Sequence, residues 1–423
     1  GPRAHAARPS DPRAGEGSGA AAHRLTLGRR LAENPLITPN DVRPSLPELE
    51  VVSVFNAAVA KVGDEVILLL RVAERPRSDI DPPPDARTLD LDGPHPVLKK
   101  LRRGYRKEDL VGVCVLDTTA DPPRVSVAYL PVNLPGLDLH DRRSIRYRNP
   151  RGERRGIDDG YTNYLAQLSH LRVARSRDGI HFTVDPLPAI AARRDIEEYG
   201  VEDPRATLID GVWYITYVSV SRWGITTSLA STRDFRSFER QGVIFLPDHK
   251  DVVLFPERVG GKFAALTRPM PQSFGRIVGI WIAFSDDLLA WGGHQPVCLP
   301  RPERWDELRT GASAVPFRVA EGWLELYHGV DHDTHYAMGA LLLDADDPRR
   351  VLARSPRPIL APEEAYEVRG LFNDTIFSCG HLDLGDGRIR MYYGAADSVM
   401  AAADFEVRDI IASLEPWRGA TAP

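Results

Sequence analysis

Two carboxylates and a guanidinium crowd together just before a hydrophobic segment of the chain. They belong to Glu202, Asp203 and Arg205, which surround Pro204. The segment beyond the Asp-Gly turn at 210–211 is rich in aromatic and β-branched residues, a pattern that predicts a β-strand. Such charges can form a ligand site, and the alternative is a structural ion pair at the strand entry. Other strands with polar residues at the same place would favour the ligand site.

Five segments of the chain share the pattern of a glycine turn that leads into a hydrophobic strand. They are GDEVILLLR from Gly63, GVWYITYVS from Gly211, GKFAALTRP from Gly261, GWLELYHGV from Gly322 and GRIRMYYGAAD from Gly387. Each ends in polar or charged residues. We interpret them as equivalent strands of five repeats, and as the innermost strand of each repeat.

A second motif, Ser/Thr-x-Asp-x-x-x-Phe/Trp, alternates with these strands. It begins at Ser176, Thr232 and Ser285, and a degenerate copy lies near Asp344. The spacing is typical of four-stranded propeller blades, and signals for helices are scarce. The sequence therefore predicts an all-β fold, a five-bladed β-propeller. A β-sandwich with accidental internal similarity is the alternative.

A charged, proline-rich insertion of about 76–165 interrupts the first repeat after its inner strand. It contains one expected hairpin, formed by DLVGVCVLD from Asp109 and PRVSVAYL from Pro123. Long insertions in compact folds often act as lids or contacts, so we expect this one to cover a propeller face or to reach a neighbouring subunit. Residues 1–24 are expected to form a flexible leader, and 25–423 a single catalytic domain.

Polar residues gather at the ends of the five repeated strands. Because the inner strands of a propeller line its central channel, we expect these residues to converge there, as one or two carboxylates with several cations. For any single residue, a solvated rim or a structural ion pair remains the alternative. The residues are Asn56, Arg71, Glu74, Glu202, Asp203, Arg205, His249, Lys250, Asp251, Arg268, Arg309, His328, Asp331, Tyr336 and Asp397.

Composition excludes several functional classes. A net charge of −5 over 423 residues gives no basic field for nucleic acid, and no apolar run reaches the length of a membrane span. Three cysteines without a CxxC pair argue against a disulfide framework and a zinc site, so a cytoplasmic setting is the simplest. His328, His332 and His335 could suggest a metal, but Gly329 and the turn-like residues after it disfavour a shared face, and we predict no metal or other cofactor.

The motifs together resemble those of glycoside hydrolase family 130, which contains β-mannoside phosphorylases and mannosidases. The similarity runs in order through nearly all of the chain after residue 24. It is carried by NPLITP at Asn34, VFNAAV at Val54, GVEDPR at Gly200, LASTRDF at Leu229, KDVVLFPERVGGKFAALTRP at Lys250, GWLELYHGV at Gly322 and YYGAAD at Tyr392. The resemblance implies a five-bladed propeller, in agreement with the repeat count.

The resemblance also implies a catalytic acid. In the family this is the aspartate of the DPR motif, here Asp203, which would protonate the glycosidic oxygen through the 3-hydroxyl of the mannose in the −1 subsite. The neighbouring carboxylate of Glu202 should help Asp203 to hold its proton, and Arg205 should oppose this if it contacts Asp203.

The family's other positions imply binding residues. Lys250, Arg268, Arg309 and Tyr336 match positions that hold phosphate, which as nucleophile replaces the water-activating base of an inverting hydrolase. Asn56, Arg71 and Asp397 would hold the −1 mannose, and Glu202 and His328 complete the expected substrate-binding set.

The resemblance thus predicts an inverting phosphorylase that converts a β-manno-oligosaccharide and inorganic phosphate into α-mannose 1-phosphate and a shortened acceptor. Two alternatives stay open. One is an inverting β-mannosidase with Glu257 or Glu325 as base, and the other is a non-catalytic carbohydrate-binding propeller. Linkage, acceptor and chain length are not visible in the sequence, and a homo-oligomer is compatible with the insertion.

Overall fold

A computed structural model describes residues 26–91, 97–102, 104–140, 144–148, 161–165, 167–417 and 419. The predicted leader, 1–24, lies outside the described residues. The prediction of an all-β fold is confirmed, because the described chain is built mainly from strands. Helical turns are short: η1 (Pro39–Asp41), η2 (Lys107–Asp109), η3 (Asp195–Glu197), α1 (Ala365–Val368) and α2 (Val407–Ala412). None of the helices in the described ranges is long and apolar enough to cross a membrane.

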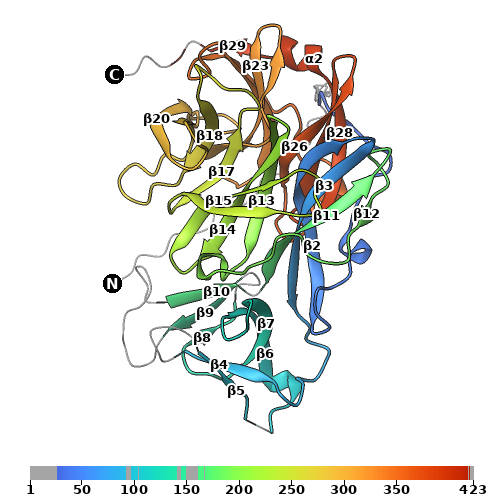
Figure 1. The fold of residues 1–423 in the computed structure, drawn as a ribbon, viewed down its shortest axis with the longest axis vertical. Helices are drawn as coiled ribbons and strands as arrows, with labels where there is room; N and C mark the ends of the chain where they lie inside the picture. The colour runs from blue at the N-terminus through green and yellow to red at the C-terminus, as the bar shows by residue number, and fades with distance from the viewer. Residues whose placement is uncertain are drawn as a thin grey trace, which may run out of the picture.

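Five antiparallel sheets, which we number I to V, contain most of the strands (Figure 1). Sheet I pairs strands in the order β12-β11-β3-β2, and sheets II and III pair theirs in chain order. The bounds in sheet I are β2 (Leu49–Val62), β3 (Glu65–Pro76), β11 (Leu168–Ser176) and β12 (Thr183–Val184). Sheet II contains β13 (Val201–Ile209), β14 (Val212–Ser221), β15 (Gly224–Thr232) and β16 (Glu239–Phe245). Sheet III contains β17 (His249–Leu254), β18 (Phe263–Pro269), β19 (Ile280–Ser285) and β20 (Trp291–Cys298).

Sheets IV and V complete the set, and sheet V brings together strands that are far apart in the sequence. Its strand order, β1-β28-β27-β26, places β1, the first strand, beside β28, which precedes α2 and β29. Sheet IV contains β21 (Arg309–Ala312), β22 (Phe317–Val319), β23 (Gly322–Val330), β24 (Tyr336–Leu343), β25 (Val351–Arg354) and β29 (Glu415–Pro416). Sheet V contains β1 (Arg29–Arg30), β26 (Ile376–Gly385), β27 (Arg388–Ala395) and β28 (Val399–Glu406).

The glycine turns explain the first hairpin of each sheet. Asp210 and Gly211 have φ angles of 50° and 77°, which are the left-handed angles of a two-residue turn between paired Ile209 and Val212. The glycine-led strands are therefore second in their sheets, and the prediction that they are innermost is wrong. In sheet II, charged residues interrupt the hydrophobic pattern of the earlier strand, which is VEDPRATLI of β13.

The edge strands at the start of each sheet lie next to one another. β2 contacts β13 and β26, β13 contacts β17, and β17 contacts β21. Each of the five largest hydrophobic clusters is shared by two sheets, in the order I–II, II–III, III–IV, IV–V and V–I. Burial of apolar surface between sheets is thus the main force that holds the five together.

The segment between β3 and β11 forms two further sheets that lie at the lower end of the molecule in Figure 1. Its predicted hairpin is confirmed by the pairing of β6 (Leu110–Asp117) with β7 (Arg124–Pro131). The remaining strands are β4 (Arg87–Asp90), β5 (Val97–Lys100), β8 (Leu137–Asp138), β9 (Ser144–Arg148) and β10 (Tyr161–Leu165). Its small core includes Tyr147 and packs against Tyr199, just before β13.

A buried carboxylate fastens β1 to sheet V. Glu367 accepts hydrogen bonds from Arg30 Nε and Nη2 at 2.7 and 2.8 Å and from the Tyr393 hydroxyl at 2.7 Å. Its side chain is 0% exposed, and burial is offset by these donors, which hold its pKa below the usual range. This ion pair links β1, near the start of the described chain, to α1, which precedes β26 of sheet V.

We expect Glu367→Ala to lower the free energy of unfolding by about 3–5 kcal/mol, because Arg30 would lose its buried counter-ion. The matched control is Glu363→Ala, which removes an ion pair to the same arginine from a side chain that is 29% exposed. Its cost should stay below about 1 kcal/mol. Chemical denaturation of both variants measures the difference, and equal costs would contradict the assignment of Glu367.

Candidate active site

Three of the edge strands carry a β-bulge at the same place, and each bulge holds a polar residue. The register of β2, β13 and β17 shifts at Asn56, Asp203 and Asp251, whose φ angles are 47°, 47° and 51°. Asn and Asp tolerate this left-handed conformation better than most residues. A β-bulge turns a side chain away from the direction that the alternation of the strand would give it. The same local feature therefore orients three residues of the candidate site.

Asp203 is bound by donors from sheet I. Its Oδ1 accepts hydrogen bonds of 2.9 Å from Asn56 Nδ2 and from Arg71 Nη1, while Arg71 Nη2 donates to Glu202 at 2.8 Å. Burial acts to raise the pKa of Asp203, but the charges of Arg71, Lys250 and Arg205 outweigh it and hold the pKa below its usual value. The expectation that Glu202 helps Asp203 to hold its proton is wrong, because Arg71 binds both carboxylates.

Asp397 shows the opposite shift. It lies in the turn between β27 and β28 and has a φ of 49°. Burial raises its pKa to about 6, and the nearby charge of Asp203 adds to this against the effect of Arg71. The site therefore contains one carboxyl group that ionises easily and a second that holds a proton to much higher pH.

The four residues predicted to bind phosphate are connected by a series of close contacts that runs through His328. We call this series the phosphate path. Lys250 and Arg268 are paired across β17 and β18, and Arg268 Nη1 lies 3.0 Å from Nε2 of His328. The His328 and Tyr336 rings stack at 6.0 Å, and the Arg309 guanidinium lies 5.9 Å from the centre of the Tyr336 ring. The structure thus brings together residues that are far apart in the sequence.

Arg205 adjoins the phosphate path at Asp251 and does not bind the Asp203 carboxylate. Its Nη1 donates to the backbone carbonyl of Asp203 at 3.1 Å, and its Nη2 donates to Asp251 Oδ1 at 3.1 Å. The other oxygen of Asp251 lies 2.9 Å from Arg268 Nη1. Sequence analysis noted Asp251 at a strand start but assigned it no role, since only the folded chain shows that it joins two arginines.

The predicted role of His328 as a direct substrate contact needs correction. Its side chain is 0% exposed, and its two nitrogens lie 2.9 Å from Ser313 Oγ and 3.0 Å from Arg268 Nη1. His332 and His335 point elsewhere, with side chains 71% and 47% exposed. Within the described ranges, no group of three or more His, Cys, Asp or Glu side chains is arranged to hold a metal ion.

The two carboxylates considered as hydrolytic bases do not suit that role. Glu257 is 53% exposed and pairs at 3.3 Å with Arg318. Arg318 lies in β22 and is not one of the residues predicted to bind phosphate. Glu325 is completely buried, accepts the Ser313 N–H at 3.0 Å, and has a pKa raised well above its usual value by burial. A carboxyl group that is completely buried and already accepts a backbone hydrogen bond is poorly placed to activate water.

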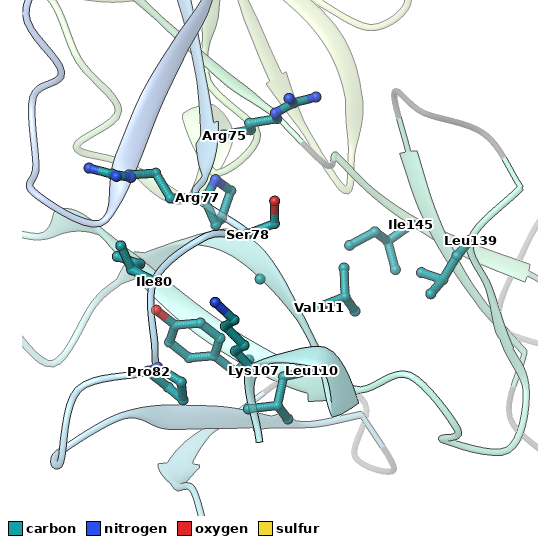
Figure 2. A pocket seen from close by; sticks show the side chains of 13 residues that line it. Arg75, Arg77, Ser78, Ile80, Pro82, Lys107, Leu110, Val111, Leu139 and Ile145 are labelled. Atoms are coloured by element: carbon teal, nitrogen blue, oxygen red, sulfur yellow. The ribbon is translucent and has the colours of Figure 1, made fainter. Parts of the chain in front are cut away.

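A separate cavity of about 520 Å³ lies where β3 enters the insertion (Figure 2). Its lining includes the cations Arg75, Arg77 and Lys107, and none of its described lining residues is a carboxylate. Arg75 is paired with Glu50 and Arg77 with Asp79, each at 2.7 Å. Because none of the predicted site residues lines it, this cavity is distinct from the candidate active site.

The raised pKa of Asp397 predicts a pH-dependent stability. The folded chain holds this proton up to about pH 6, whereas the ordinary pKa of an aspartate is 3.8, so the unfolded chain releases it first as the pH rises. Relative to Asp397→Asn, the free energy of unfolding of the wild type should fall by about 2 kcal/mol as the pH rises from 4 to 6. Urea denaturation across this range measures the difference, and a gap that does not vary with pH would refute the shift.

Comparisons with known proteins show which family this chain is similar to. The sequence model of glycoside hydrolase family 130, described as β-1,4-mannooligosaccharide phosphorylase, matches residues 157–415. A β-1,2-mannobiose phosphorylase of Listeria innocua serovar 6a is 39% identical over 91% of this chain and 98% of its own. A 1,2-β-oligomannan phosphorylase of a Thermoanaerobacter species is 38% identical over 60% of this chain and 85% of its own. The solved structure of the Listeria innocua protein with β-1,2-mannobiose has a TM-score of 0.76 at 38% identity and covers 91% of this chain and 98% of that one.

Proposed function

This protein belongs to glycoside hydrolase family 130, and on that premise we propose that it is an inverting β-mannoside phosphorylase. The enzyme cleaves a β-mannosidic bond with inorganic phosphate and releases α-mannose 1-phosphate. The names of its relatives make β-1,2-mannobiose the first substrate to test.

Two cations without a carboxylate partner carry this proposal. Among the described residues, neither Lys250 nor Arg309 has a carboxylate within ion-pair distance, whereas Arg71, Arg205 and Arg268 are all paired. Partly buried cations without counter-ions attract an anion, and two of them match the charge of hydrogen phosphate. Water, which is the co-substrate of a hydrolase, gives no reason for such a charge excess.

The proposed step joins the two halves of the site. Asn56, Arg71 and Asp397 hold the −1 mannose, and phosphate lies between Lys250, Arg268, Arg309 and Tyr336. A phosphate oxygen forms a bond to the anomeric carbon while the glycosidic bond breaks, and Asp203 supplies a proton to the leaving oxygen through the 3-hydroxyl of the sugar. Phosphate also offsets the charge of Lys250, one of the cations that keep the pKa of Asp203 low, so its binding favours the protonated acid.

We also infer that the five sheets are the blades of a five-bladed propeller. The support is the cyclic order of the hydrophobic clusters, which returns from sheet V to sheet I, together with the neighbouring edge strands at the start of each sheet. Propellers often join the last blade with the first strand of the chain, and β1 beside β28 follows that pattern. In this arrangement the bulges of β2, β13 and β17 face the central channel.

The function is tested by incubating the purified protein with β-1,2- or β-1,4-mannobiose, with and without inorganic phosphate. We expect mannose 1-phosphate to form only when phosphate is present, at a higher rate from the β-1,2-linked disaccharide. Free mannose released as a product at the same rate in both conditions would make the protein a hydrolase and overturn the proposal. No turnover of either sugar would favour the binding-module alternative.

The acid role of Asp203 is tested by Asp203→Asn. We expect kcat to fall by about 10²–10⁴-fold, because an amide cannot supply the proton. The control is Asp210→Asn, an exposed turn residue of the same hairpin whose φ of 50° suits asparagine. Asp210→Asn should keep wild-type kinetics. Full activity of Asp203→Asn would show that another group is the acid.

A further inference from the structure

A buried serine lies behind the phosphate path. Ser313 follows β21 in sheet IV, is 0% exposed, and donates its backbone N–H to Glu325 Oε1 at 3.0 Å. Its backbone carbonyl accepts a 3.2 Å hydrogen bond from Arg205 Nε, and its Oγ lies 2.9 Å from Nδ1 of His328. The backbone of Ser313 is thus held from two sides, which leaves its hydroxyl aimed at one histidine nitrogen.

The other nitrogen of His328 determines where the ring carries its proton. Nε2 lies 3.0 Å from Arg268 Nη1, and a guanidinium can only donate hydrogen bonds. Nε2 must therefore be the unprotonated acceptor, so the proton of the neutral ring is on Nδ1 and is donated to Ser313 Oγ. Burial, together with the charges of Arg268 and Arg205, holds the pKa of His328 well below its usual value despite the nearby carboxylate of Asp251, in agreement with a neutral ring.

We propose that Ser313 is a positioning residue for phosphate, which holds His328 in the Nδ1–H tautomer so that the histidine can fix Arg268. In this tautomer Arg268 Nη1 can donate to His328 Nε2 at 3.0 Å, and it forms an ion pair with Asp251 Oδ2 at 2.9 Å. The Nε of the same guanidinium has no hydrogen-bond partner among the described residues, so it remains available for the anion. The inference rests on the proposed function, because it takes phosphate as the ligand of Arg268.

Loss of the serine hydroxyl would change the tautomer of His328. The Nδ1 proton would lose its acceptor, and the tautomer with the proton on Nε2 would become favoured because Asp251 Oδ2, 3.5 Å away, can accept it. An N–H on Nε2 would then face the N–H of Arg268, and the two donors would repel. The ring itself is held by Phe377 at 4.5 Å and Tyr336 at 6.0 Å, so the proton moves rather than the imidazole.

The first test reads the tautomer directly by two-bond ¹H–¹⁵N correlation NMR on protein labelled with ¹⁵N-histidine. The signals of His328 are assigned by their loss in His328→Gln. We expect the Nδ1–H pattern in the wild type and the Nε2–H pattern in Ser313→Ala. A wild type with an Nε2–H or imidazolium pattern would overturn the proposal without the need for any folded Ser313 variant.

The second test is kinetic. Ser313→Ala should raise the KM for phosphate about tenfold, the effect of one lost hydrogen bond, and change the KM for mannobiose less than twofold. Ser313→Thr keeps the hydroxyl and should restore the phosphate KM.

The matched control is Ser378→Ala. Ser378 is equally buried and lies at the bulge of β26, but its Oγ bonds only to backbone groups of the same sheet. This variant should lose stability and keep the phosphate KM. Equal kinetic effects of the two alanine variants would reduce Ser313 to a structural role. Phosphate-independent turnover by the wild type would instead refute the proposed function, while the NMR result would still decide the tautomer.

Discussion

The buried ion pair between Arg205 and Asp251 is the interaction on which the site depends. Arg205 is 1% exposed and Asp251 0%, and the guanidinium also donates to backbone carbonyls of Asp203, Ala312 and Ser313. One side chain thereby joins sheets II, III and IV next to Asp203 and Asp251. Burial of two charges is costly, and the hydrogen bonds that Arg205 donates to three backbone carbonyls offset part of that cost.

The second constraint is the bulge that recurs in β2, β13 and β17. The same left-handed backbone position presents a hydrogen-bond donor at Asn56, an acid at Asp203 and a counter-ion at Asp251. A non-glycine residue in this conformation is strained, and such strain persists only where the surrounding structure holds it. The hydrophobic clusters between the sheets supply that support, since they fix the edge strands against one another.

In the proposed reaction, the charges of the site connect the binding of phosphate with the protonation of Asp203. The charges of Arg71, Lys250 and Arg205 hold the pKa of Asp203 below its usual value, which favours the ionised form over the proton donor. A phosphate dianion beside Lys250 reduces this field, and a sugar that displaces water strengthens the opposing effect of burial. We therefore propose that phosphate acts as the nucleophile and also raises the pKa of Asp203 when it binds. An aspartate that lies among arginines can then still donate a proton once phosphate is bound.

The sequence by itself determined the features that arise from neighbouring residues. Asp-Gly turns and alternating hydrophobic strands are local, so the all-β fold, the five repeats and the insertion hairpin could be predicted. The family motifs indicated a candidate acid and the residues proposed to bind phosphate. Only the tertiary structure decided which strand of each repeat lies at the inner edge, that Arg71 bridges Glu202 and Asp203, and that His328 lies behind Arg268 with Ser313 as its partner. Protonation states and side-chain directions depend on charges that other sheets supply from positions many residues away, and no local pattern in the chain encodes those distances.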